Sequence, residues 1–200
     1  TMMISRFQMF KAVYFHKTVR AGEVMLLEAM SLADDYLGLS KMNVESYMIQ
    51  TDDSILQQLT SLPEDTSELK AAKKIATDYQ DRKLFKCVFE KTISGKKSFG
   101  RNKLKQFRED IAKKSKLAES QIFIDTSTTH SMPLAPSKKE SSSIILIKKE
   151  GSKVIPKTIP ISEIPLVSSM SGKMNILRAY TQQKNRNKVE IAAKSILGEL

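Results

Sequence analysis

Residues 11–20, KAVYFHKTVR, bring two aromatic rings, an imidazole and three cations together within ten positions. The side chains that could do chemistry are Tyr14, His16 and Lys17, with Arg6 about two helical turns earlier. Arginine offers a planar fork of donors to phosphate oxygens, whereas lysine acts as a point charge. The segment could therefore bind anions. Periodicity alone favours the other interpretation, in which its cations pair with carboxylates of neighbouring helices.

Apolar residues at spacings of three and four predict one long helix from Met2 to Tyr36, ending near Gly38. On such a helix Arg6 and Lys17 share one stripe and lie roughly 16 Å apart along the axis, at about 1.5 Å per residue. One small phosphate cannot bridge that separation. The geometry thus predicts that any anions bound by these two cations occupy two sites.

Catalytic and metal-binding patterns are scarce. The chain has two histidines, His16 and His130, and one cysteine, Cys87, so we expect neither a hydrolytic triad nor a zinc site or disulfide made by this chain alone. We interpret His130 as an exposed loop residue and Cys87 as a packing residue. Phosphate-loop, nucleophile-elbow and HExxH motifs are missing, and SGKKSFG (94–100) is interpreted as a basic turn. Motifs alone do not make this chain an enzyme.

The net charge of +11 is unevenly distributed. Residues 1–92 hold twelve Lys and Arg against thirteen Asp and Glu, whereas residues 93–200 hold twenty-one against nine. A basic half suits a polyanionic partner such as nucleotide or nucleic acid, and a solvated lysine-rich surface is the plainer alternative. No stretch of eighteen apolar residues and no signal-peptide pattern occurs, so we expect no membrane span and a cytoplasmic location.

The helices and strands expected along the chain predict an α+β fold. Short helices at Asn43–Gln50, at Asp52–Leu62 and from Ser67 make the first part helical. The second part is predicted as an antiparallel sheet with helices on one face, in a split-βαβ layout. Its expected strands lie near 84–93, 121–126, 143–149, 154–159 and 175–182, and its helices at 102–117 and 187–197. We expect buried strands at 121–126 and 143–149, with a polar loop (Thr126–Ser142) between them. A hairpin turn is predicted at 149–153, and Pro156 marks an edge strand.

Several segments resemble the HD-domain phosphohydrolases of the deoxynucleotide triphosphohydrolase type, the family that includes the SAM-and-HD-domain dNTPase. They are RFQMFKAVYFHKTVRAGEVMLLEAM, QTDDSILQQL and ELKAAKKIATDYQDRKLFKCVFEKT, followed more loosely by QIFIDT and NILRAYTQQKNRNK. The resemblance implies two domains. Residues 1–82 would be the last helices of an all-α HD hydrolase domain, and residues 83–200 a smaller basic α+β domain.

In that family a histidine, a His-Asp dyad and a distant aspartate hold a metal ion upstream of the matching helix. This chain has no His-Asp pair, because Lys17 follows His16 and Ser131 follows His130. The resemblance therefore implies the C-terminal part of such an enzyme. A divalent metal (Mg, Mn, Fe or Zn) is expected in the parent protein, where it would activate a water for attack on the α-phosphate. None is expected to bind this chain alone.

Matched by position, Arg6 corresponds to an arginine that contacts the substrate triphosphate, and Tyr14 to a tyrosine of the deoxyribose pocket. His16 and Lys17 correspond to residues of a nucleotide effector site between subunits. One position departs: Gln182 stands where the regulated family member has an effector-binding lysine. The resemblance thus leaves nucleotide activation open.

These observations predict a part of a dNTP phosphohydrolase that supplies substrate-pocket and effector-interface residues, assembles as a homo-oligomer and is inactive in isolation. Two alternatives remain. One is a non-catalytic basic module that binds single-stranded nucleic acid, stacking bases on its few aromatics Phe99, Phe107, Phe123 and Tyr180. The other is a purely structural role, in which the exposed face of the first helix seals a homodimer.

Overall fold

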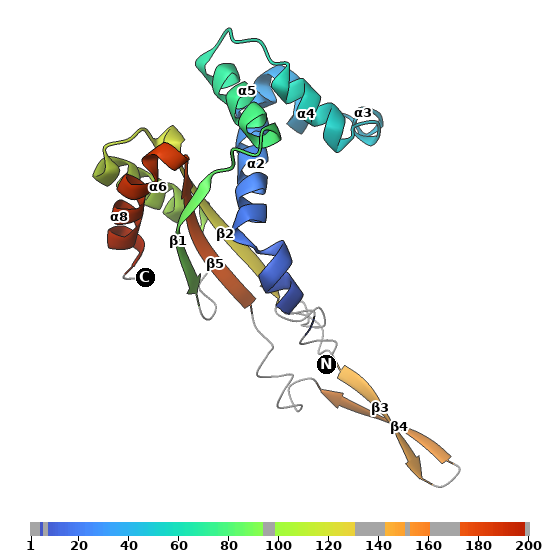
Figure 1. Ribbon diagram of the computed structural model, residues 1–200. Helices are drawn as coiled ribbons and strands as arrows, with labels where there is room; N and C mark the ends of the chain where they lie inside the picture. Colours follow the sequence, from blue (N-terminus) through green and yellow to red (C-terminus); the bar gives the residue numbers. More distant parts are fainter. Residues whose placement is uncertain are drawn as a thin grey trace.

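The computed structural model describes residues 5, 8–93, 99–130, 143–150, 153–160 and 173–198 (Figure 1). The first part is helical: η1 (Phe10–Tyr14), α2 (Lys17–Leu37), η2 (Leu39–Lys41), α3 (Val44–Met48), α4 (Asp52–Thr60) and α5 (Ser67–Gln80). The second part contains β1 (Lys86–Ile93), α6 (Arg101–Ser115), η3 (Glu119–Gln121), β2 (Ile122–His130), β3 (Ser143–Glu150), β4 (Lys153–Pro160), β5 (Lys173–Thr181), η5 (Gln183–Asn185) and α8 (Arg186–Leu197). The predicted α+β class is confirmed. Within these ranges no helix has both the length and the apolarity needed to cross a membrane.

Local signals explain most helix ends. Gly38 terminates α2 in the left-handed conformation, with φ at 65°, as its lack of a Cβ allows. Thr51 and Ser54 form a reciprocal capping box at the start of α4, since each side-chain oxygen accepts the backbone N–H of the other residue. The Thr66 hydroxyl caps α5 by accepting the Leu69 N–H. These ends match the sequence predictions to within a few residues.

The prediction of one unbroken helix over Met2–Tyr36 is wrong. The π-helical turn η1 ends at Tyr14, His16 is extended (φ −61°, ψ 134°), and α2 begins at Lys17. Helical-wheel geometry therefore does not relate residues on the two sides of this break, and the predicted common stripe of Arg6 and Lys17 does not apply. Arg6 itself lies outside the described residues.

The three-stranded sheet has the order β1-β5-β2, and β5 is antiparallel to both neighbours. The outer strands β1 and β2 are therefore parallel to each other, with α6 connecting them and β5 inserted between them. This is the predicted split βαβ arrangement. A bulge between Cys87 and Phe89 shifts the register of β1 against β5.

Helices pack on both faces of this sheet, so the prediction of helices on one face was incomplete (Figure 1). Leu177 and Ala179 of β5 join a core with residues of α6 and α8. Tyr180, the residue after Ala179, joins a second core on the opposite face, together with residues of α2 and α5. The alternation of strand side chains thus ties the helical part to the sheet. The division at residues 82 and 83 stays a prediction.

The strands β3 and β4 form the predicted hairpin, which Figure 1 draws away from the three-stranded sheet. Ile145 and Ile147 are 65% and 71% exposed, so the prediction of a buried strand at 143–149 is wrong. Pro156 is opposite Ile147 in this two-stranded ladder, where both strands are edges and proline is tolerated.

The polar loop predicted for Thr126–Ser142 is partly strand. Because β2 pairs with β5 as far as His130, residues 126–130 belong to the sheet, and the prediction that His130 lies in a loop is wrong. The predicted exposure of the His130 side chain, the remainder of that loop and most of the basic turn (94–98) fall outside the described residues.

Candidate functional site

The predicted site residues surround the break between η1 and α2. Tyr14, the last residue of η1, is 49% exposed. His16 caps α2, and its Nδ1 accepts the Thr18 N–H at 3.3 Å. This contact assigns the proton of the neutral imidazole to Nε2, which remains a donor. Lys17 is exposed at the first position of α2.

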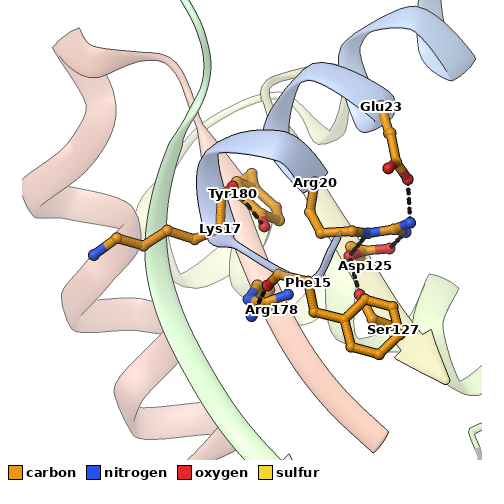
Figure 2. A network of polar contacts seen from close by, with 8 residues as sticks. All are labelled: Phe15, Lys17, Arg20, Glu23, Asp125, Ser127, Arg178 and Tyr180. Atoms are coloured by element: carbon orange, nitrogen blue, oxygen red, sulfur yellow. Dashed lines mark hydrogen bonds and ion pairs between the residues drawn. The ribbon is translucent and has the colours of Figure 1, made fainter. Parts of the chain in front are cut away.

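Two side chains of the central strand β5 bond to the backbone at this break (Figure 2). Arg178 donates from Nη2 to the carbonyl of Phe15 at 2.7 Å and from Nε to Glu90 at 2.7 Å. The hydroxyl of Tyr180 donates to the carbonyl of Lys17 at 3.2 Å. Burial is the main reason that the pKa of Tyr180 is raised well above its usual value, so the phenol stays protonated and can donate.

A third contact joins α2 to β2. The guanidinium of Arg20 binds both carboxylate oxygens of Asp125, from Nε at 3.0 Å and from Nη2 at 2.5 Å. Ser127 donates to the same carboxylate, and Glu23 pairs with the remaining guanidinium nitrogen (Figure 2). The first turn of α2 is thereby fixed to the sheet from two strands.

Two cavities flank Lys17. The first, of about 400 Å³, is lined by Phe15, His16, Lys17, Cys87, Val88, Phe89, Glu90, Thr92, Ile176 and Arg178. The second, of about 320 Å³, is lined by Lys17, Thr18, Arg82, Leu84, Phe85, Lys86, Cys87 and Arg186. The structure thus places His16 and Lys17 together at the first cavity. Tyr14 lines neither of them.

The second cavity is a cationic pocket. Four of its lining residues carry positive charge, namely Lys17, Arg82, Lys86 and Arg186, and none is acidic. Arg82 lies just after the end of α5. Its φ of 60° is an unusual backbone conformation for a residue other than glycine. Sequence reasoning missed Arg82, Lys86 and Arg186. The run DRKLFK (81–86) was the one local signal that could have indicated two of them.

Gln182, which stands where the regulated family member has an effector-binding lysine, does not line the cationic pocket. It lines a third cavity of about 520 Å³ together with Lys184 and the lysines Lys74, Lys83 and Lys86. Lys17 is not part of that lining. Lys86 is the cation that the third cavity shares with the cationic pocket.

The described residues do not fit a metal ion. Nowhere in the described ranges do three His, Cys, Asp or Glu side chains gather closely enough to hold one. The Nδ1 atom of His16 is already engaged by Thr18. Burial also raises the pKa of the Cys87 thiol, whose Sγ lies 3.3 Å from the carbonyl of Phe89. No step of a reaction is therefore derived through a metal on this chain.

The aromatic side chains of the basic half are mostly enclosed. Phe107, Phe123 and Tyr180 are buried, and Phe99 packs edge-on against Phe107. Phe123 stacks on Phe85, with 4.4 Å between ring centroids. Base stacking requires open ring faces. These contacts weigh against the stacking form of the nucleic-acid alternative.

Comparisons with known proteins agree with the resemblance seen in the sequence. A protein of Dictyostelium discoideum described as a deoxynucleoside triphosphate triphosphohydrolase SAMHD1 homolog is 31% identical over 122 residues, or 60% of this chain. The chain spans only 23% of that relative's length. A crystal structure of a hypothetical protein from Aquifex aeolicus shares the fold, with a TM-score of 0.61 at 19% identity over 96% of this chain and 44% of the other.

The family match covers nearly the whole chain. Residues 1–198 match the family described as the HD associated region. The kinship with HD-type dNTP triphosphohydrolases predicted from the sequence is thus confirmed at the level of the family. This chain belongs to the family of HD associated regions.

Proposed function

We propose that this chain is the C-terminal part of an HD-type phosphohydrolase of deoxynucleoside triphosphates, and that its cationic pocket binds the polyphosphate of a nucleotide. The relative from Dictyostelium bears the name of such an enzyme, which supports the substrate class. The observation that carries the proposal is a cavity lined by four cations and no carboxylate.

Charge and position favour a polyphosphate in this pocket. In the part of the chain that the structure describes, Lys17, Arg82 and Lys86 form no ion pair, so their charges are available to a ligand. The N-terminal turn of α2 contributes Lys17 and Thr18 to the wall, and a helix N-terminus favours anions. The volume of about 320 Å³ lies at the lower end of the roughly 300–1,000 Å³ range of ligand pockets.

The substrate side of the proposal involves Arg6 and Tyr14. Tyr14 lies in η1, across the break from Lys17, and lines neither cavity that Lys17 borders. This separation supports two sites, with a substrate wall at Arg6 and Tyr14 and an effector wall at His16 and Lys17. The metal centre of the parent enzyme would supply the activated water, and we place it outside this chain.

Titration calorimetry with tripolyphosphate and with dNTPs tests the cationic pocket. We expect Arg82→Gln and Lys86→Gln each to weaken tripolyphosphate binding about tenfold, as expected when a charged hydrogen bond is removed. Lys105→Gln is the matched control, since Lys105 is exposed on α6 and does not line the pocket. Equal losses in all three variants would mean diffuse attraction to the basic surface and would contradict the proposal.

The proposal also predicts that the isolated chain is inactive and that the parent enzyme is a homo-oligomer. Measurable manganese-dependent hydrolysis of dNTPs by the 200-residue chain would refute the first statement. Sedimentation with and without dNTP addresses the second, because an effector site between subunits should promote assembly. A chain that stays monomeric at high concentration, with nucleotide bound, would contradict the intersubunit placement.

A further inference from the structure

Glycine and proline do not explain the break between η1 and α2. Residues 11–20 contain neither glycine nor proline, the residues behind most sharp helix interruptions. In a continuous helix the carbonyl of Phe15 would accept the N–H of Val19. With His16 extended, α2 starts at Lys17 and Phe15 lies outside its hydrogen-bond ladder. The carbonyl of Phe15 is therefore free to accept a hydrogen bond from a donor other than the Val19 N–H.

Arg178 supplies that contact from 163 positions away. Its Nη2 holds the Phe15 carbonyl, while its Nε holds Glu90 on the neighbouring strand β1. The side chain is only 3% exposed, and it comes from the central strand of the sheet, which is paired on both sides. The guanidinium is therefore held rigidly in place. A third nitrogen, Nη1, is buried and has no hydrogen-bond partner within the described ranges.

Tyr180 makes the complementary contact from the same face of β5. Its hydroxyl donates to the carbonyl of Lys17, so the two side chains hold the carbonyls immediately before and immediately after His16. The phenol is completely buried in the core that α2 shares with the sheet. Two fixed points on one strand thus define the path of the chain through the break.

We propose that Arg178 is a positioning residue, which with Tyr180 imposes the break between η1 and α2 and so orients His16 and Lys17. Because Arg178 belongs to β5, the sheet sets the position of Lys17 in the cationic pocket. The effect on ligand affinity rests on the proposed polyphosphate site. The effect on the geometry of the break does not, because it follows from the contacts alone.

Two variants separate this role from simple stability. Arg178→Met keeps a long side chain but removes every donor, and leaves Glu90 half exposed to water. Tyr180→Phe removes only the hydroxyl and keeps the buried ring. We expect amide exchange at residues 15–20 to become about tenfold faster in the first variant and severalfold faster in the second, as for lost charged and neutral hydrogen bonds. Exchange in α4 and α5 should stay unchanged.

Ligand binding gives the second measurement. We expect tripolyphosphate to bind Arg178→Met several times more weakly, although Arg178 does not line the cationic pocket. Arg178→Lys keeps the charge but cannot bridge Phe15 and Glu90 as a fork, so it should restore only part of the affinity. Arg186→Gln is the control: it removes a pocket charge and should weaken binding without changing exchange at residues 15–20.

The outcomes are distinguishable. Unchanged exchange at residues 15–20 in both Arg178→Met and Tyr180→Phe would overturn the positioning role. Faster exchange spread evenly over α4 and α5 would also overturn it, because the side chains would then serve only global stability. If the unmodified chain fails to bind tripolyphosphate, the proposed function falls, and the exchange measurements still decide the role of Arg178.

Discussion

Arg20 of α2 and Asp125 of β2 form a two-pronged ion pair between residues 105 positions apart. The side chains are only 18% and 8% exposed, and Ser127 satisfies a further lone pair of the carboxylate. Because the pair is largely shielded from water, losing one member leaves an uncompensated charge near the core. The contact is therefore more important for stability than the ion pairs on the surface.

We expect Asp125→Ala to lower the free energy of unfolding by about 2–3 kcal/mol, somewhat below the loss for a fully buried pair because Glu23 still partners Arg20. Urea unfolding measures the change. Asp81→Ala is the control, since it breaks an exposed pair with Lys83 and should change stability far less. Similar losses of unfolding free energy in both variants would show that the Arg20–Asp125 pair stabilises the fold no more than an exposed pair does.

Gly22 of α2 lies against the ring of Tyr79 of α5. A Cβ at this position would lie 3.2 Å from Cε2 of Tyr79, a contact that the ring must relax to accept. Alanine should change stability by less than about 1 kcal/mol, because its better helix propensity offsets the contact. Gly22→Leu should destabilise the fold by roughly 1–3 kcal/mol through overpacking, measured by urea unfolding. Adding Tyr79→Ala should recover part of that loss. If it recovers none, the explanation is wrong.

Stability should decline at alkaline pH partly through Tyr180. Its pKa in the folded chain lies above the ordinary value of 10.0, chiefly because the phenol is buried. The unfolded chain therefore loses this proton first, so the contribution is complete below about pH 10 and is lost as the pH rises further. We expect Tyr180→Phe to show a flatter decline than wild type above about pH 10. Tyr47→Phe should behave like wild type, because Tyr47 is exposed. Equal slopes in all three would contradict the prediction.

Cys87 should react slowly with thiol reagents. Burial raises the pKa of its thiol, so the reactive thiolate is scarcer than in an unfolded chain at the same pH. We expect alkylation by iodoacetamide at about pH 8 to be at least several times slower in the folded chain than in denaturant, followed by mass spectrometry. Equally fast labelling in the two states would show an accessible thiol, contrary to the interpretation of Cys87 as a packing residue.

Much of the secondary structure follows from local signals. Thr51, Thr66 and Gly38 mark helix ends by side-chain capping or backbone freedom, which depend on neighbours a few residues away. The strands at 86–93 and 173–181 are evident from β-branched and aromatic residues. The hairpin strand at 143–150 misled the prediction, since Ile145 and Ile147 suit a buried strand but lie exposed.

The candidate site was only partly predictable. The sequence singled out Lys17 and His16 within one long helix, whereas the structure has them at the start of α2, with Lys17 on both cavities and His16 on the first. Anion binding by either residue stays a prediction. Arg82 and Lys86, from one short run, and Arg186, about a hundred positions later, join Lys17. Exposed cations at such separations look like ordinary surface residues until the fold places them around one cavity. The spacing of these residues in the sequence therefore could not predict that they line one cavity.

Patterns in the sequence were enough to predict the α+β class, the split βαβ order, most helix ends and the kinship with HD-type proteins. The break of KAVYFHKTVR at His16, and the hydrogen bonds from Arg178 and Tyr180 to the carbonyls on its two sides, became evident only in the folded chain. The physical reason is that local propensity favours a continuous helix there. Hydrogen bonds from a strand 163 residues away outweigh that preference only once the sheet has formed.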